Sequence, residues 1–174
     1  VLPAAQGLVL FSNNEQFILF ADQGVVTPQT AIIKSIGNYE LDPIISPVEL
    51  GDEFYYINKS ANFTRTLMMI TRGMENDPMV TEASRLAPEY VPSTVNNLYA
   101  NPQNSFIVLA DSNQEYMWFF KTHVEGQQRM MNAWFKWKLP GNVLSCVFNA
   151  DNIFTIISAD SKLVVTSAPL NESA

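Results

Sequence analysis

A repeated hairpin pattern is the feature that most constrains the fold of this chain. Runs of about five to eight residues rich in Val, Ile, Phe, Tyr and Trp alternate with short turns of Asn, Asp, Ser and Gly, which is typical of β-strands and tight turns. Four hairpins are predicted, with paired strands at 8–11 and 15–20, 48–50 and 53–57, 106–110 and 114–121, and 144–148 and 152–158. A third strand is predicted after each hairpin, at 30–36, 64–71, 131–139 and 162–167.

The hairpins recur at a spacing that favours a propeller. Their turns are centred near positions 13, 52, 112 and 151, at intervals of about 39, 60 and 39 residues. Three or four strands repeated at roughly 40 residues are the pattern of a β-propeller blade. Blades stack because one twisted blade cannot bury both faces alone, and strands such as 117–120 are apolar on both faces. We therefore predict an all-β fold, a β-propeller-like array of about three to four antiparallel blade units, with a β-sandwich as the alternative.

The longest interval contains the one departure from the repeat. Asp77 and Pro78 match a helix N-cap and a first helical residue, and apolar residues then recur at helical spacing until Pro88. We therefore predict a short helix at 79–86 inside a helical insertion that spans 75–92. An insertion of this kind carries binding in some proteins and covers a sheet edge in others, and the sequence leaves both readings open.

Charge is scarce and mostly negative. Asp and Glu number 17 and Lys and Arg number 10 among 174 residues, so the net charge is −7 and charged residues make up 16%. Proteins that grip nucleic acid use Lys and Arg to displace phosphate counterions, and this balance argues against that class. Residues 1–64 carry −5 and residues 65–174 carry −2, so the negative charge is concentrated in the first part. So small a charged fraction also predicts that some of the surface is covered in the native assembly.

The cysteine count and the hydropathy exclude further classes. Cys146 is the single cysteine, so no intramolecular disulfide and no Cys/His zinc cluster can form, and its apolar neighbours predict a buried thiol. The sequence has no run of 18 or more apolar residues, so no membrane span is predicted. The chain begins without Met or a basic segment, and we expect a fragment of a longer protein rather than a signal peptide.

Acidic side chains at turns are the main candidates for chemistry. Glycoside hydrolysis needs two carboxyl groups that flank a sugar. The acids that could pair are Glu49, Asp52 and Glu53, Asp111 with Glu115, and Glu75 with Asp77. Carboxylates at turns usually bond to nearby backbone or solvent. The same explanation suffices for the oxygen-bearing side chains of the turn at 111–113, which could otherwise be read as calcium ligands. His123 lies in a predicted loop, and the sequence has no nucleophile motif with which it could form a catalytic triad. We predict no catalytic, cofactor-binding or metal-binding residues and no cofactor.

One basic and aromatic segment superficially resembles a surface for stacking nucleic-acid bases. Its members are Arg129, Trp134, Lys136, Trp137 and Lys138. Strand alternation places Trp134 on the face of the two lysines, whereas Trp137 shares the other face with Phe135. We therefore predict that one of the two tryptophans belongs to the core.

Several short strings, in order along most of the chain, resemble one protein family. They are GLVLFS at 7–12 with QFIL at 16–19, VTPQT at 26–30, Pro47 with Gly51 and FYY at 54–56, the stretch 72–90 with PEYVP at 88–92, WFFK at 118–121 and NAWFKW at 132–137. They look like a strand pair, an L-T-P-x-T segment, a P-x-x-x-G turn with an aromatic strand, a helical insertion, and W-x-x-K and A-W-x-x-W strands. In this order they resemble tail tubular protein B, the nozzle protein of T7-like podoviruses.

The resemblance implies a non-enzymatic structural protein of the virion. Members of that family are longer, so it implies that this chain is a central, propeller-type portion, a single domain over 1–174. It also implies a six-fold ring in the phage tail that continues the DNA channel of tail tubular protein A and supports tail fibres. Genomic DNA would pass during ejection without specific binding, and an acidic, weakly charged wall suits that role. The alternatives are a propeller that binds or hydrolyses host glycan and a cellular protein-interaction propeller.

Overall fold

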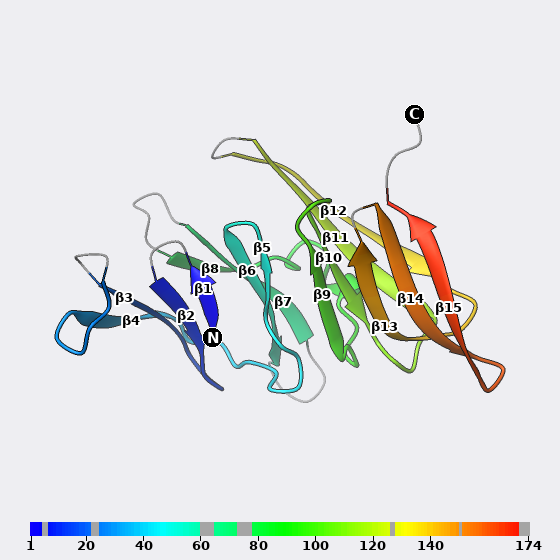
Figure 1. Cartoon of the computed structure of the whole chain (residues 1–174), viewed down its shortest axis with the longest axis horizontal. Helices are drawn as coiled ribbons and strands as arrows, with labels where there is room; N and C mark the ends of the chain where they lie inside the picture. The colour runs from blue at the N-terminus through cyan, green and yellow to red at the C-terminus, as the bar shows by residue number, and fades with distance from the viewer. Residues whose placement is uncertain are drawn as a thin grey trace. The chain divides into compact units, whose positions relative to one another are not determined.

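The computed structural model describes residues 1–4, 7–21, 25–59, 65–72, 78–125, 128–149 and 151–170. These residues form β-strands and turns with one short 3-10 helix, and the chain divides into two compact units, Val1–Leu86 and Ala87–Ala174 (Figure 1). No α-helix occurs in the described ranges, and no helix there is long and apolar enough to cross a membrane.

The first unit holds two four-stranded antiparallel sheets, each a simple meander. Sheet A consists of β1 (Leu2–Ala4), β2 (Gly7–Phe11), β3 (Gln16–Ala21) and β4 (Ala31–Gly37). Sheet B consists of β5 (Val48–Leu50), β6 (Glu53–Lys59), β7 (Arg65–Arg72) and β8 (Pro78–Glu82). In both sheets the spatial order of the strands is their order in the sequence, as in a propeller blade.

The second unit repeats this construction with one strand fewer. Sheet C consists of β9 (Asn97–Asn101), β10 (Phe106–Ala110), β11 (Tyr116–Glu125) and β12 (Gln128–Lys138). Sheet D consists of β13 (Asn142–Asn149), β14 (Asn152–Ala159) and β15 (Lys162–Pro169). Each described sheet is an open meander rather than a closed barrel. The predicted fold class, an all-β array of antiparallel blade-like sheets, is confirmed.

The core of the first unit lies between sheets A and B. Its buried members come from β2, β6 and β7 and are Val9, Phe54, Tyr56, Met68 and Ile70. The ring of Phe11 meets Tyr56 edge-on, with centroids 5.4 Å apart. Burying each such apolar side chain contributes about 1.5–3 kcal/mol, so this shared face holds the two meanders together.

The core of the second unit lies between sheets C and D. Phe119 on β11 stacks on Phe135 with centroids 4.8 Å apart and lies 4.5 Å from Trp137. Sheet D supplies Val143, Cys146 and Ile153 to the same cluster. Phe135 and Trp137 alternate along β12, as expected where one face of a strand packs on a neighbouring sheet. Val143 and Cys146 are three residues apart and still share the cluster because the register of β13 shifts between Val143 and Ser145.

The predicted helix at 79–86 is wrong, because the first part of this segment is strand β8. Val80 and Thr81 pair with Ile70 and Met69 of β7, and Val80 packs against the core of the first unit. The apolar residues that set the helical spacing do not share a buried face, since Leu86 is 96% exposed. Sheet pairing and β-branched residues outweigh a weak local helix signal here.

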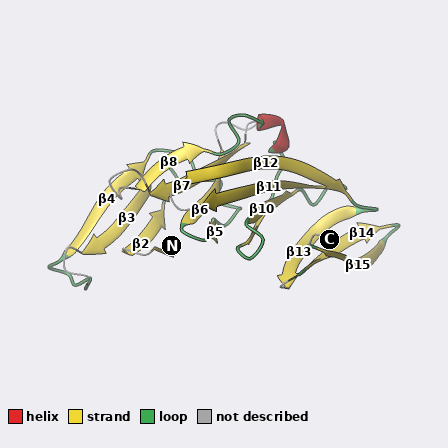
Figure 2. Cartoon of the chain, turned by 90° about the horizontal axis from the view of Figure 1, so that it is seen from above, coloured by secondary structure: helices red, strands yellow, loops and turns green. Residues whose placement is uncertain are grey.

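A single 3-10 turn is the only helical element within the described part of the predicted insertion. It is η1, Pro88–Tyr90, shown in red in Figure 2. Pro88 fits the first turn because a missing N–H costs nothing there. Tyr90 lies against Trp134 of β12, with ring centroids 5.8 Å apart, so the turn packs on a face of sheet C.

Candidate functional site

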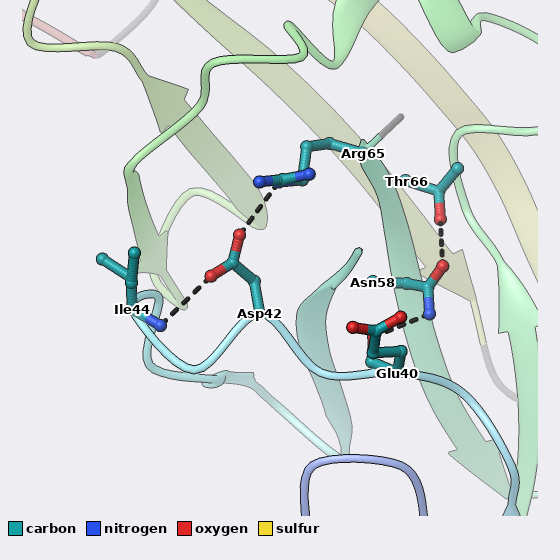
Figure 3. A network of polar contacts seen from close by, with 6 residues as sticks. All are labelled: Glu40, Asp42, Ile44, Asn58, Arg65 and Thr66. Carbon is teal, nitrogen blue, oxygen red and sulfur yellow. Dashed lines mark hydrogen bonds and ion pairs between the residues drawn. The ribbon is translucent and has the colours of Figure 1, made fainter. Parts of the chain in front are cut away.

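Asp42 is the centre of a buried polar network in the first unit (Figure 3). Its carboxylate Oδ2 lies 2.9 Å from Arg65 Nε in an ion pair, and its Oδ1 accepts a hydrogen bond of 3.1 Å from the Ile44 backbone N–H. The Asp42 side chain is 3% exposed and the Arg65 side chain is 12% exposed. Both oxygens of the carboxylate are therefore engaged by structural partners.

The same network joins strand β6 to the segment that precedes β5. Asn58 Nδ2 donates a hydrogen bond of 2.7 Å to the Glu40 backbone oxygen, which also accepts from the Lys59 N–H at 3.0 Å. Thr66 Oγ1 donates to Asn58 Oδ1 at 3.3 Å. We call Glu40, Asp42, Asn58, Arg65 and Thr66 the β6–β7 clamp, since they join this segment to both strands (Figure 3).

Asn58 and Thr66 also line an open hollow of about 530 Å³. Its rim carries Tyr39, Glu82 and Arg85, so one acidic and one basic side chain face the same space. The clamp hydrogen bond between Asn58 and Thr66 already joins two of its polar walls. The hollow has the character of a polar surface depression rather than of a catalytic pocket.

Asp111, a candidate acid from the sequence, is buried and fully engaged in the second unit. Its Oδ1 accepts from the Asn113 N–H at 2.9 Å, and its Oδ2 accepts from Gln114 Nε2 at 2.8 Å and from the Thr94 hydroxyl. Asp111 is 1% exposed. This carboxylate holds the β10–β11 turn in shape, as the hairpin-turn interpretation predicted.

The other candidate acids are dispersed. Glu115 forms an ion pair of 3.4 Å with Lys138 on the surface, and Glu53 accepts a hydrogen bond of 2.6 Å from Tyr55. Glu49 and Asp52 are exposed beside the β5–β6 turn. The remaining pair, Glu75 and Asp77, lies outside the described residues. In the described ranges, no group of three or more His, Cys, Asp or Glu side chains could hold a metal ion.

His123 and Cys146 occupy ordinary structural positions. His123 is exposed on β11, within the strand rather than in the predicted loop, and its register partner is Met131 of β12. Cys146 is buried in the core between sheets C and D, as predicted. Burial raises the pKa of the Cys146 thiol to about 12, so the thiol is protonated and unreactive at neutral pH.

The basic and aromatic segment of β12 divides between its two faces as predicted. Trp137 belongs to the core between sheets C and D, whereas Trp134 packs on Phe120 with ring centroids 4.8 Å apart. Lys136 lies over the ring of Tyr116 at 5.2 Å. The tryptophan rings are therefore engaged in packing within sheet C and with its neighbours, not presented as a stacking platform for bases.

A second buried polar group, Gln16, was not identified from the sequence. Its Nε2 donates to the Tyr39 backbone oxygen at 2.9 Å, and its Oε1 accepts from the Tyr56 hydroxyl at 3.1 Å. Burial, with a smaller contribution from Tyr39, raises the pKa of Tyr56 well above its ordinary value. Asp42 was also missed, although the Asp42-Pro43 dipeptide is a known turn signal that could have located its loop.

Comparison with known proteins places the chain in a family. No curated protein matches its sequence. Among solved structures it is similar to Kluyveromyces lactis Hsv2, with a TM-score of 0.51 and 9% identity over 99% of this chain and 51% of that chain. The chain thus spans about half the length of that structure, and at this identity the likeness concerns the fold alone. The model of the family described as bacteriophage nozzle protein matches residues 1–174. Because this match covers the whole chain, the protein belongs to the bacteriophage nozzle protein family and is a structural component of the virion tail.

Proposed function

We propose that this chain forms part of the wall of the tail conduit through which genomic DNA leaves the virion. The observation that carries the proposal is the family match over the whole chain, joined to a net charge of −7 with a charged fraction of only 16%. An acidic wall repels the phosphate backbone at close range, so the duplex slides instead of binding. In this role the protein works as a rigid lining, and its buried carboxylates serve the fold.

The proposal includes the partners of the conduit. The chain acts as part of a longer nozzle polypeptide that assembles as a six-fold ring, docks on tail tubular protein A and supports the tail fibres. A ring of identical subunits closes on itself through heterologous contacts, which suits a tube wall. The scarcity of charged side chains supports subunit contacts of this kind, because interface cores are depleted in charge.

A catalytic role in cleaving host glycan has weaker support. Inverting and retaining glycosidases need two carboxyl groups that face the same sugar, one of them with a raised pKa. Asp111 is enclosed by three hydrogen-bond donors, and Glu115 is paired with Lys138 on the surface. These arrangements favour a structural, non-enzymatic function.

The location of the chain in the virion and its lack of binding to duplex DNA can be tested separately. Antibodies raised against this chain should label the distal end of the tail in electron micrographs of intact particles, and averaged images should show six-fold symmetry there. Label confined to the capsid would refute the tail-conduit assignment.

A gel-shift assay then tests whether the chain binds duplex DNA. The purified chain should give no retention of duplex DNA at about 50 mM salt, where electrostatic binding is strongest. A basic protein of similar size serves as the positive control. Retention of the duplex by this acidic chain would contradict the sliding-wall mechanism, even if the antibody confirms the location.

A further inference from the structure

Sheet D is incomplete beside its three sister sheets. Sheets A, B and C each contain four strands, whereas among the described residues sheet D contains only β13, β14 and β15. Within the described part of the chain, β15 (red in Figure 1) pairs only with β14, over all eight of its residues. Its other edge therefore presents a full row of backbone groups with no strand beside it in the described chain.

The turn before β15 fixes which backbone groups point to that edge. Asp160 and Ser161 have φ values of 48° and 60°, so they form a two-residue turn of the type that joins tight hairpins. The residues that flank such a turn, Ala159 and Lys162, form a hydrogen-bonded pair, and hydrogen-bonded pairs then alternate along the ladder. The even-numbered residues of β15 thus bond to β14. The N–H groups that point to the open edge belong to Leu163, Val165 and Ser167.

The middle of this edge, between Lys162 at the start of β15 and Pro169 at its end, lacks the features that usually protect an exposed strand. Residues 163–168 have no charged side chain, and their pairing with β14 contains no bulge. Among the other edge strands, β4 contains Lys34, β12 carries Lys136 and Lys138, β8 begins with Pro78, β1 and β5 have three residues each, and the pairing of β13 contains a register shift, whereas β9 is short and uncharged. Native edge strands use lysine, proline and short length to prevent pairing, and the six residues between Lys162 and Pro169 have none of these, so this stretch can accept a strand.

The side chains around the edge are apolar as well. Leu163 and Val165 are 73% and 68% exposed. They share one face of sheet D with residues from β13 and β14 that are also exposed, namely Val147, Phe154 and Ile156. An added strand with apolar residues at alternate positions would extend this face and shield its margin.

We propose that an antiparallel strand from the same nozzle polypeptide, outside residues 1–174, pairs with β15 and completes sheet D. In each sister sheet the fourth strand follows the third in the same chain, after connections that span 22–30, 73–77 and 126–127. The same construction in sheet D places the missing strand in the same polypeptide rather than in a neighbouring subunit. This inference rests on the proposed place of the chain in a longer tail protein.

Amide hydrogen exchange in the complete nozzle polypeptide tests the proposal. In the unassembled polypeptide, the edge-facing amides of Leu163, Val165 and Ser167 should exchange as slowly as those of Val164 and Thr166, which bond to β14. If the edge is open, the two sets should differ by at least about tenfold in exchange rate. Fast exchange at the edge-facing amides would overturn the proposal. Protection that arises only when the ring assembles would also overturn it, because the strand would then come from another subunit.

A proline substitution gives an independent test in the same polypeptide. Val165→Pro removes one edge-facing N–H and leaves the β14 ladder intact, so an open edge tolerates it. We expect Val165→Pro to lower the melting temperature clearly more than Val165→Ala, which removes the side chain and keeps the N–H. Equal melting temperatures for the two variants would contradict the added strand. Should Val165→Pro fail to fold, the exchange experiment on the wild type still decides. Neither readout depends on where the protein sits in the virion, so the result stands apart from the antibody experiment.

Discussion

Removing the carboxylate of Asp42 should destabilise the first unit strongly. In Asp42→Ala, Arg65 loses the oxygen that lies 2.9 Å from its Nε, and the Ile44 N–H loses its acceptor at 3.1 Å. The two ionic side chains are 3% and 12% exposed, so solvent cannot easily replace the missing charge. Breaking such a pair on one side costs about 3–5 kcal/mol, which includes the penalty on the remaining partner. Against a typical total of about 5–15 kcal/mol, this is a large loss.

Urea denaturation of the variants measures this loss. Glu115→Ala is the matched control, because the Glu115–Lys138 pair has side chains that are 47% and 63% exposed and should contribute at most about 1 kcal/mol. Asp42→Asn should fall between the two, since an amide oxygen can still accept from Ile44 while the charge is lost. The reasoning is refuted if Asp42→Ala lowers the free energy of unfolding by no more than Glu115→Ala does, while the slope of that free energy against urea concentration is the same in both variants.

Two further outcomes test the core and the turns. Burial raises the pKa of Cys146 from 9.0 to about 12, so the folded chain holds this proton more tightly than the unfolded chain and the associated stability is lost as the pH rises through that range. A thiol reagent at pH 8 should therefore react only after urea unfolding, and fast reaction of the native chain would contradict the burial. Gly7→Ala should lower the melting temperature far more than Gly51→Ala. A Cβ at Gly7 would lie 2.0 Å from the Leu19 carbonyl oxygen. Gly51 has open space around it, and only its φ of 63° disfavours alanine there, by about 1–2 kcal/mol. Similar melting temperatures would show that the β2–β3 approach is looser than described.

Strands with strong local signals could be predicted from the sequence alone. The four hairpins and their third strands correspond to elements of the structure, with boundaries shifted by a few residues. These segments combine β-branched and aromatic residues with turns of Asn, Asp, Ser and Gly, so local preference and tertiary packing agree. Where the signal is weak it fails: β1 and β9 are short or contain Asn and Ala, and neither was predicted.

Partners distant in the sequence could not be predicted. No residue near Asp42 in the sequence indicates that it pairs with Arg65. The role of Gln16 depends on Tyr39, in the segment after β4, and on Tyr56 of β6. The same limit produced the wrong helix, because pairing of β8 with β7 decides its conformation. Local patterns report which segments can be strands, whereas register and burial depend on which segments meet.

The low charged fraction now has a physical explanation in two parts. All five residues of β10 are buried, and so are the five central residues of β6, so these strands have no face on which a charge could sit. Burial on both faces thus accounts for the absence of charge in these two strands. That account does not extend to β15, whose residues 163–168 are uncharged although most of them are exposed. An exposed strand with a continuous uncharged stretch suits pairing with a further strand, which the proposed fourth strand of sheet D would provide.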